Sequence, residues 1–122
     1  MPSVRCLIVD DSANFRDAAT NALERAGISV VGVAGNCADA LTRYRELRPD
    51  VTLVDVDLGA ESGFDLAAEL HEADSPAPSV ILISMHSELD FADMIAASPV
   101  LGFLPKFLLS PTAIKDLLAE KA

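Results

Sequence analysis

The chain has 122 residues, a length at which one domain can bury a hydrophobic core without disulfide or metal support. Hydrophobic residues make up 51% and charged residues 23%, which is typical of a folded globular protein and excludes a disordered one. The net charge of -10, with only 9 lysines and arginines spread along the chain, argues against general nucleic-acid binding and fits a domain that holds a cation or contacts a basic surface.

The first predicted strand and helix bring two acids to one turn. The apolar run over residues 4–9 predicts a buried strand, and Asp10 and Asp11 follow at its carboxyl end. Ser12 then predicts the cap of a helix, and Gly27 predicts its end. We therefore expect both acids to lie between a strand and its helix.

The second and third units repeat this order of strand and helix. Valine-rich residues 28–34 predict a strand, and Asn36 predicts the start of a helix that ends before Pro49. Residues 51–57 begin with apolar and β-branched side chains, which predict a strand buried on both faces whose apolar part ends at Asp55. Desolvating an unpaired carboxylate is costly, so an acid at this position indicates a role other than packing.

A third helix and a fourth strand follow. Residues 63–70 carry an apolar helical stripe, and the proline-containing stretch 75–78 predicts a short stiff connector. Residues 80–83 predict a buried strand that closes on Ser84. A hydroxyl is therefore expected at the end of this strand.

The last part of the chain predicts one more strand between two helices. Apolar side chains within residues 91–95 mark a fourth helix, which Pro99 stops. Residues 100–104 predict the fifth strand, and Lys106 follows it closely. Serine and proline at residues 110–111 are a strong signal for the start of the final helix.

Five strand and helix units in alternation predict an α/β fold, with a five-stranded parallel sheet covered on both faces, in one domain over residues 1–122. Ligands of such sheets bind beyond the carboxyl ends of the strands, near the point where the strand order reverses. The polar side chains expected at this edge are Asp10, Asp11, Asp55, Asp57, Ser84 and Lys106.

These side chains are the groups that phosphoryl transfer requires. Several carboxylates in one cleft repel one another, so one is protonated or a cation is present. Oxygen ligands without Cys or His favour magnesium over zinc. Asp55 could act as the nucleophile while the metal and Lys106 neutralise the phosphoryl oxygens, and Ser84 could bond to one of those oxygens.

Four motifs stand at the strand ends in chain order: Leu7-Ile8-Val9-Asp10-Asp11, Leu53-Val54-Asp55, Ile81-Leu82-Ile83-Ser84 and Gly102-Phe103-Leu104-Pro105-Lys106. Together they resemble the receiver domain of bacterial two-component response regulators, and the resemblance covers essentially the whole chain. It implies the doubly wound, flavodoxin-like (βα)5 receiver fold. The region of the first helix and second strand looks closest to receivers that precede a helix-turn-helix output domain.

Carried over residue by residue, the resemblance implies a phosphoacceptor site with a metal. Asp55 would accept a phosphoryl group from a sensor histidine kinase. Asp11 would bind Mg2+ directly and Asp10 largely through water, together with Asp55 and the backbone carbonyl of Asp57. The resemblance implies no enzymatic activity beyond phosphorylation and dephosphorylation of the domain itself.

The resemblance also implies how the signal leaves the site. Lys106 would pair with the phosphoryl oxygens, and Ser84 would bond to one of them. Phe103 matches an aromatic position that repacks inward when the hydroxyl residue moves, which changes the face formed by the fourth helix, fifth strand and fifth helix. A phosphorylation-dependent homodimer and control of transcription by a DNA-binding domain outside this chain are the implied outputs.

Localisation and partners follow from simpler features. No apolar run approaches the length of a membrane span, and residues 1–5 do not form a signal peptide, so we expect a cytoplasmic protein without membrane contact. Cys6 lies in an apolar run, which predicts a small core residue in a reducing compartment. We expect this domain to make no direct contact with nucleic acid.

Several candidates also have purely structural interpretations. Asp10 and Asp11 would suit a helix start, where acids interact with the helix dipole. The side chain of Asp57 is expected to be a solvated turn residue, and Phe103 would suit the core. Ser84 and Lys106 would likewise suit a strand-terminal turn and a solvated surface. His71 and His86 have no metal-ligand partner in the sequence, so we expect both to face solvent.

The chain departs from the family pattern at two positions, and two rival functions remain. Met85 stands where a small side chain is common, which would narrow the approach to Asp55, and Phe107 stands where proline is common after Lys106. A receiver-like interaction module that does not depend on phosphorylation is one rival. The other is a magnesium-dependent phosphatase, because Asp55 and Asp57 also resemble the nucleophile motif of haloacid-dehalogenase-type phosphatases.

Overall fold

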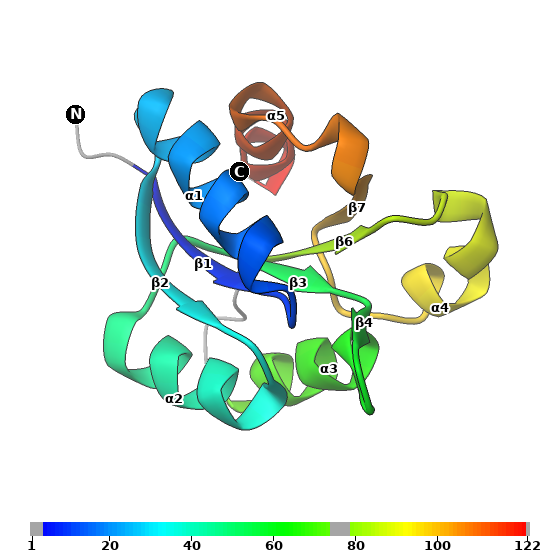
Figure 1. The fold of residues 1–122 in the computed structure, drawn as a ribbon. Coiled ribbons are helices and arrows are strands. Elements are labelled where there is room, and N and C mark those ends of the chain that lie inside the picture. Colours follow the sequence, from blue (N-terminus) through cyan, green and yellow to red (C-terminus); the bar gives the residue numbers. More distant parts are fainter. Residues whose placement is uncertain (1–3, 74–78, 122) are drawn as a thin grey trace.

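The computed structural model describes residues 4–73 and 79–121, so the connector predicted over 75–78 lies outside the described residues. Strands and helices alternate along the chain (Figure 1). The larger elements are β1 (Arg5–Val9), α1 (Ala13–Arg25), β2 (Ser29–Ala34), α2 (Cys37–Leu47), β3 (Val51–Asp55), α3 (Gly63–Ala73), β6 (Val80–Ser84), α4 (Ala92–Ala96), β7 (Gly102–Pro105) and α5 (Pro111–Lys121). The shorter ones are β4 (Asp57–Leu58), β5 (Glu61–Ser62) and the 3-10 helices η1 (Glu88–Phe91) and η2 (Lys106–Leu108).

One parallel sheet organises the molecule. Its strands lie in the order β2-β1-β3-β6-β7, which is the five-stranded, doubly wound α/β sheet that the sequence predicts. The chain passes from β1 to β2 on one side and then crosses to β3 on the other side of β1. The strand order therefore reverses at β1, and the carboxyl ends of β1 and β3 lie next to each other at this switch point.

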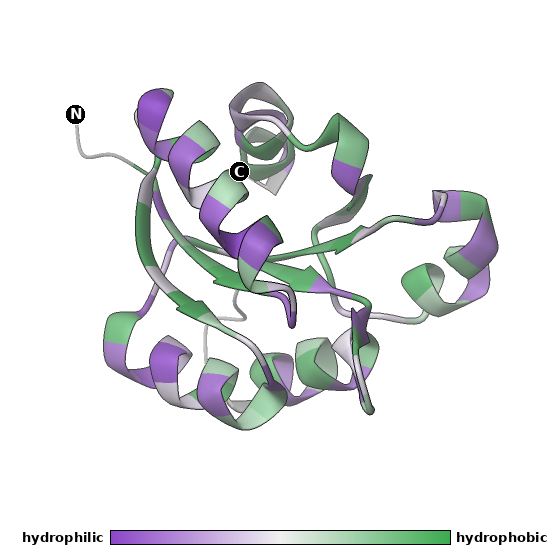
Figure 2. Cartoon of the chain, in the orientation of Figure 1, coloured by the Kyte–Doolittle hydropathy of each residue, from purple (hydrophilic) through white to green (hydrophobic). Residues whose placement is uncertain are grey.

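The sheet is covered on both faces by helices, with α1 and α5 on one face and α2 and α3 on the other (Figure 1). Successive strand residues point to opposite faces, so Leu7 and Val9 belong to the core under α2 and α3 while Cys6 and Ile8 belong to the core under α1 and α5. Figure 2 shows the resulting hydrophobic strands between helices of mixed polarity. Cys6 is fully buried as predicted, and burial raises the pKa of its thiol to about 12.

Local hydrogen bonds explain where the first two helices begin and end. The Ser12 side chain accepts a hydrogen bond from the N–H of Phe15 at 3.2 Å and caps α1. The Asn36 side chain accepts one from the N–H of Asp39 at 2.9 Å and caps α2. Gly27 follows α1 with a φ of +89°, a left-handed conformation that glycine adopts without strain.

The structure adds short elements that the sequence pattern did not indicate. After β3 the chain forms the antiparallel β4–β5 hairpin, in which Asp57 pairs with Ser62, where only a turn was expected. The strand predicted over 100–104 is observed as β7, Gly102–Pro105, and a single hydrogen bond from the Leu101 N–H to the Val80 carbonyl leads into it. These differences add a hairpin and move one strand start, and they leave the five-stranded parallel sheet intact.

The segment formed by η1 and α4 is short and weakly covered. Neither helix contains a buried residue, and α4 has 5 residues. Leu89 is 86% exposed and Met94 is 49% exposed. Across residues 4–73 and 79–121, no helix has the length and apolar character that crossing a membrane would require.

Candidate functional site

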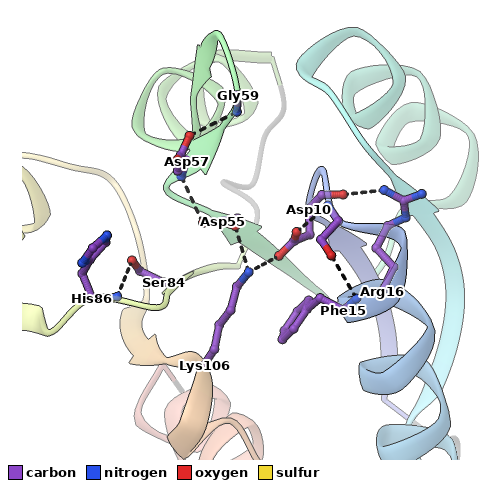
Figure 3. A network of polar contacts seen from close by, with 10 residues as sticks. Asp10, Phe15, Arg16, Asp55, Asp57, Gly59, Ser84, His86 and Lys106 are labelled. Carbon is purple, nitrogen blue, oxygen red and sulfur yellow. Dashed lines mark hydrogen bonds and ion pairs between the residues drawn. The ribbon is translucent and has the colours of Figure 1, made fainter.

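Three charged side chains meet at the carboxyl edge of the sheet (Figure 3). Asp10 follows β1, Asp55 ends β3, and Lys106 follows β7 directly. Because Val9 and Val54 are partners in the parallel pairing of β1 and β3, the next residues along both strands emerge side by side. The Lys106 side chain extends toward both acids from the other side of β6 (Figure 3).

Lys106 forms an ion pair with each acid. Its Nζ lies 2.6 Å from Oδ2 of Asp10 and 3.0 Å from Oδ2 of Asp55. The Lys106 side chain is only 10% exposed, so solvent screens these contacts less than it screens surface pairs. Burial lowers the pKa of Lys106, but the hydrogen bonds to Asp10 and Asp55 and the charges of these two acids together outweigh burial and raise this pKa above its usual value. Lys106 is therefore a fixed cation between two buried carboxylates.

The environment of Asp55 makes its charge costly. Asp55 is 6% exposed, and burial raises the pKa of its carboxyl above the usual value. The N–H of Asp57, which donates to Oδ1 of Asp55 at 3.0 Å, and the ammonium of Lys106 act in the opposite direction. The charged form of Asp55 therefore depends on these two partners.

Asp10 is held by its side chain and its backbone. The Ser12 N–H donates to Oδ1 of Asp10 at 2.8 Å, and the Asp10 N–H donates to the Ala34 carbonyl at 3.0 Å. Nη1 of Arg16 donates to the Asp10 carbonyl at 2.6 Å. A Cβ at Gly35 would lie only 3.1 Å from that nitrogen, so the small residue leaves space for the guanidinium. No residue pattern in the sequence singles out Arg16, because its partner is a backbone atom.

The carboxylates of Asp10, Asp11 and Asp55 offer oxygen atoms that all lie within 4.8 Å of one another. Asp11 is exposed, whereas the other two are buried. One ammonium does not balance three carboxylates, and an all-oxygen donor set with one open side fits a small, hard divalent cation. These residues therefore fit the Mg2+ that the sequence predicts.

The segment after Asp55 is held close to it. The side chain of Asp57 is exposed, as expected of a solvated turn residue, and its Oδ1 accepts a hydrogen bond from the Gly59 N–H at 3.1 Å. Gly63 packs directly on the end of β3: an added Cβ would meet the Asp55 carbonyl oxygen and lie 2.8 Å from the Asp55 carbonyl carbon. The Gly63 N–H donates to the Val56 carbonyl at 2.9 Å, so α3 begins against the acid-bearing strand.

Ser84 and Phe103 lie beside the charged residues without joining their ion pairs. Ser84 is buried at the end of β6, and its Oγ accepts a hydrogen bond from the His86 N–H at 3.0 Å (Figure 3). Phe103 is buried in the core, with its ring centroid 6.2 Å from that of Phe91. Phe91 in turn lies 5.8 Å from Phe64 at the start of α3. The aromatic rings thus link β7, η1 and α3.

The structure also places the positions where the chain departs from the family pattern. Met85 is 73% exposed and Phe107 is 76% exposed, so both side chains extend into solvent beside the site. His71 and His86 are exposed, as predicted, and the His86 ring lies 6.1 Å from the ring of Phe91. The narrowing of the approach to Asp55 by Met85 stays a prediction.

Phe15 is a further residue of the site that sequence reasoning missed. Nζ of Lys106 lies 4.2 Å from the centroid of the Phe15 ring, within the range of a cation–π interaction. In the sequence, Phe15 is one member of the apolar stripe of α1, and that stripe is explained by core packing alone. The contact of the Phe15 ring with Lys106 is seen only in the structure, where α1 lies beside the start of η2.

Comparison with known proteins gives one family over most of the chain. The model of the response regulator receiver domain matches residues 6–119. The chain is similar to the chemotaxis protein CheY of Thermotoga maritima, with 31% identity over 93 residues that cover 76% of this chain and 78% of that protein. It is also similar to the DNA-binding response regulator MtrA of Mycolicibacterium paratuberculosis, with 34% identity over 119 residues, 95% of this chain and 48% of that protein.

Other relatives are much longer than this chain. A protein-glutamate methylesterase/protein-glutamine glutaminase of Methanospirillum hungatei is 31% identical over 115 residues, which are 93% of this chain and only 33% of that protein. Among solved structures, the signal receiver domain of the putative response regulator NarL from Mycobacterium tuberculosis superimposes with a TM-score of 0.86 at 29% identity, covering 98% of both chains. The chain thus spans about a third of the methylesterase relative and nearly all of the isolated receiver.

Proposed function

Because the chain belongs to the response regulator receiver domain family, we propose that Asp55 takes a phosphoryl group from a sensor histidine kinase and that this event controls an output. The observation that carries the proposal is the pair of contacts from Lys106 Nζ to the carboxylates of Asp10 and Asp55. A buried carboxylate beside a fixed cation suits phosphoryl transfer, because the cation offsets charge on the phosphoryl oxygens.

The transfer itself follows from the polar contacts of Asp55. A carboxylate oxygen of Asp55 attacks the phosphorus of the donor, the bond from phosphorus to the kinase histidine breaks, and its electron pair leaves with the histidine nitrogen. Lys106 keeps Asp55 ionised before the attack and then contacts the phosphoryl oxygens. The chain acts only on its own carboxylate, and hydrolysis of the acyl phosphate returns it to the starting state.

Asp10, Asp11 and Asp55 would hold Mg2+, with the backbone carbonyl of Asp57 as a further ligand. When bound, the ion supplies positive charge that offsets the phosphoryl oxygens. The protein contributes the arrangement of the ligands: the Ser12 N–H holds one oxygen of the Asp10 carboxylate, and Asp11 lies on the exposed side of the cluster.

We propose that Ser84 and Phe103 pass the signal to the surface. Ser84 would exchange its hydrogen bond from the His86 N–H for one to a phosphoryl oxygen. Movement of the loop that begins at Ser84 would then change the packing of Phe103 against Phe91. The face built by α4, β7 and α5 would change, and a phosphorylation-dependent homodimer through this face is the expected readout.

The proposed output is transcription, carried out by a DNA-binding domain outside this chain. MtrA is named as a DNA-binding response regulator, and a LuxR-family two-component response regulator from Aurantimonas superimposes with a TM-score of 0.86 at 27% identity. The net charge of -10 disfavours DNA contact by the receiver itself. We propose a cytoplasmic location, because ATP, the phosphoryl source of a kinase, is a cytoplasmic metabolite.

Labelling with acetyl phosphate tests the proposal without knowledge of the kinase. Incubation with acetyl phosphate and Mg2+ is expected to add one phosphoryl group, detected by intact mass, and omission of Mg2+ is expected to prevent it. Asp55→Asn should abolish labelling, because the amide is not a nucleophile. Asp17→Asn removes one exposed acid from α1 and is the matched control that should be labelled as the native chain is.

The outcomes separate the proposed function from its rivals. Labelling that persists in Asp55→Asn would contradict the assignment of the acceptor. Multiple turnover on small phosphomonoesters would favour the phosphatase. Partner binding that does not change with acetyl phosphate and Mg2+ would favour the interaction module.

A further inference from the structure

Four residues of the site form a closed ring of contacts that includes the cation: Asp10, Ser12, Phe15 and Lys106. The Ser12 N–H holds Oδ1 of Asp10 at 2.8 Å, and the Ser12 side chain accepts the N–H of Phe15 at 3.2 Å. The Phe15 ring lies 4.2 Å from Nζ of Lys106, and Lys106 returns to Oδ2 of Asp10 at 2.6 Å. Figure 3 shows Phe15 and the two acids on different sides of the ammonium.

We propose that Phe15 is a positioning residue that holds the Lys106 ammonium between Asp10 and Asp55 through the face of its aromatic ring. A lysine ammonium sits at the end of a flexible four-carbon stem, so its place depends on what surrounds it. Asp10 and Asp55 attract it from the side of the sheet, and the negative face of the Phe15 ring attracts it from the side of α1.

Phe15 is itself held in a way that suits this role. Its backbone N–H is fixed by the Ser12 cap at the start of α1. Its side chain is partly buried and packs on the apolar cluster under α1 and α5, which contains Ile8 and Ile114. The start of α1 therefore orients two groups: the Ser12 N–H holds the Asp10 carboxylate, and the Ser12 side chain holds the backbone of Phe15, whose ring faces Lys106.

Core packing alone would not require an aromatic side chain at this position. A leucine would fill much of the same apolar space, but it has no electron-rich ring face to attract an ammonium. The proposal thus distinguishes Phe15→Leu, which keeps an apolar side chain, from Phe15→Tyr, which keeps the ring. The matched control is Phe107→Leu, which removes the exposed ring that follows Lys106 in the sequence.

Nuclear magnetic resonance of the lysine side chains tests the contact directly. The Phe15 ring current should shift the Hε protons of Lys106 upfield from those of Lys115 in the native chain. The shift should vanish in Phe15→Leu and persist in Phe15→Tyr and Phe107→Leu. A Lys106 resonance that is the same in the native chain and in Phe15→Leu would overturn the proposal, and thermal unfolding confirms that each variant is folded.

The effect on phosphoryl transfer rests on the proposed function and is measured separately. Phe15→Leu is expected to slow labelling by acetyl phosphate and Mg2+ about fivefold, as the loss of a partly desolvated cation–π contact predicts, and Phe15→Tyr is expected to restore it. Equal rates for the native chain and Phe15→Leu would overturn the positioning role. If the native chain takes up no phosphoryl group, the proposed function fails, while the Lys106 resonance still decides the contact.

Discussion

Two regions of the molecule differ in how deeply they are buried. One is the edge of the sheet at which β1 and β3 end, and the other is the η1–α4 segment. Residues 6–9 of β1 and the apolar residues of β3 are fully buried, and their strands lead into the ion pairs of Lys106. The η1–α4 segment has no buried residue and exposes Leu89 and Met94. The groups proposed to receive the phosphoryl group thus stand on the packed part, and the proposed responding surface includes the less buried part.

The largest test of this contrast compares Leu66 of α3, which lies in the same core cluster as Val9 and Val54, with Leu89 of η1. Leu66 is fully buried in the core, so Leu66→Ala is expected to lower the free energy of unfolding by about 3 kcal/mol. Leu89 is 86% exposed, and Leu89→Ala is expected to change it by less than about 0.5 kcal/mol. Urea unfolding measures both, and a cost at Leu89 equal to that at Leu66 would show that η1 is firmly packed.

A smaller effect is expected where α3 meets the acid-bearing strand. Gly63→Ala would press its new methyl group into the Asp55 backbone, and we expect a loss of about 2 kcal/mol because the backbone on both sides must shift. Gly32→Ala is the matched control, since its methyl group would meet mainly the end of the flexible Leu47 side chain, at 2.7 Å. Unfolding curves in which both variants lose the same stability would argue against a rigid contact at Gly63.

The smallest effect concerns a hydroxyl inside the packed region. Thr52 is fully buried in β3, and its Oγ1 has no hydrogen-bond partner within residues 4–73 and 79–121. Thr52→Val is expected to raise the free energy of unfolding by about 1 kcal/mol, because it removes an unpaired buried polar group. At Thr20, whose Oγ1 donates to the Arg16 carbonyl at 2.7 Å, the same change should bring no gain. Destabilisation by Thr52→Val would show that its hydroxyl is satisfied.

The sequence predicts the charged residues of the site because each follows a buried apolar run. Asp10, Asp55 and Lys106 stand at strand ends, and a parallel sheet necessarily brings such ends to one edge. Their meeting is observed, and their roles in phosphoryl transfer stay predictions. Ser84 is also at the expected strand end. Its hydroxyl accepts a hydrogen bond from the backbone N–H of His86, and no residue pattern predicts that contact.

Other features could not be read from the chain for physical reasons. The strands of the β4–β5 hairpin, which begin at Asp57 and Glu61, have 2 residues each, too few for any hydrophobic period to appear. Phe15 satisfies the helical stripe of α1 whether or not a lysine approaches its ring. Arg16 binds a backbone carbonyl, and any residue at position 10 would offer the same atom.

The ring of contacts around Lys106 also has a consequence for the order in which the chain becomes competent. Asp10 and Lys106 stand near opposite ends of the sequence, so their ion pair forms only after β7 has joined the sheet. During synthesis, the acids of β1 and β3 emerge well before the lysine that pairs with them. A nascent or truncated chain without β7 would therefore present its acidic cluster without this cation, and under the proposed function it would be a poor acceptor of a phosphoryl group.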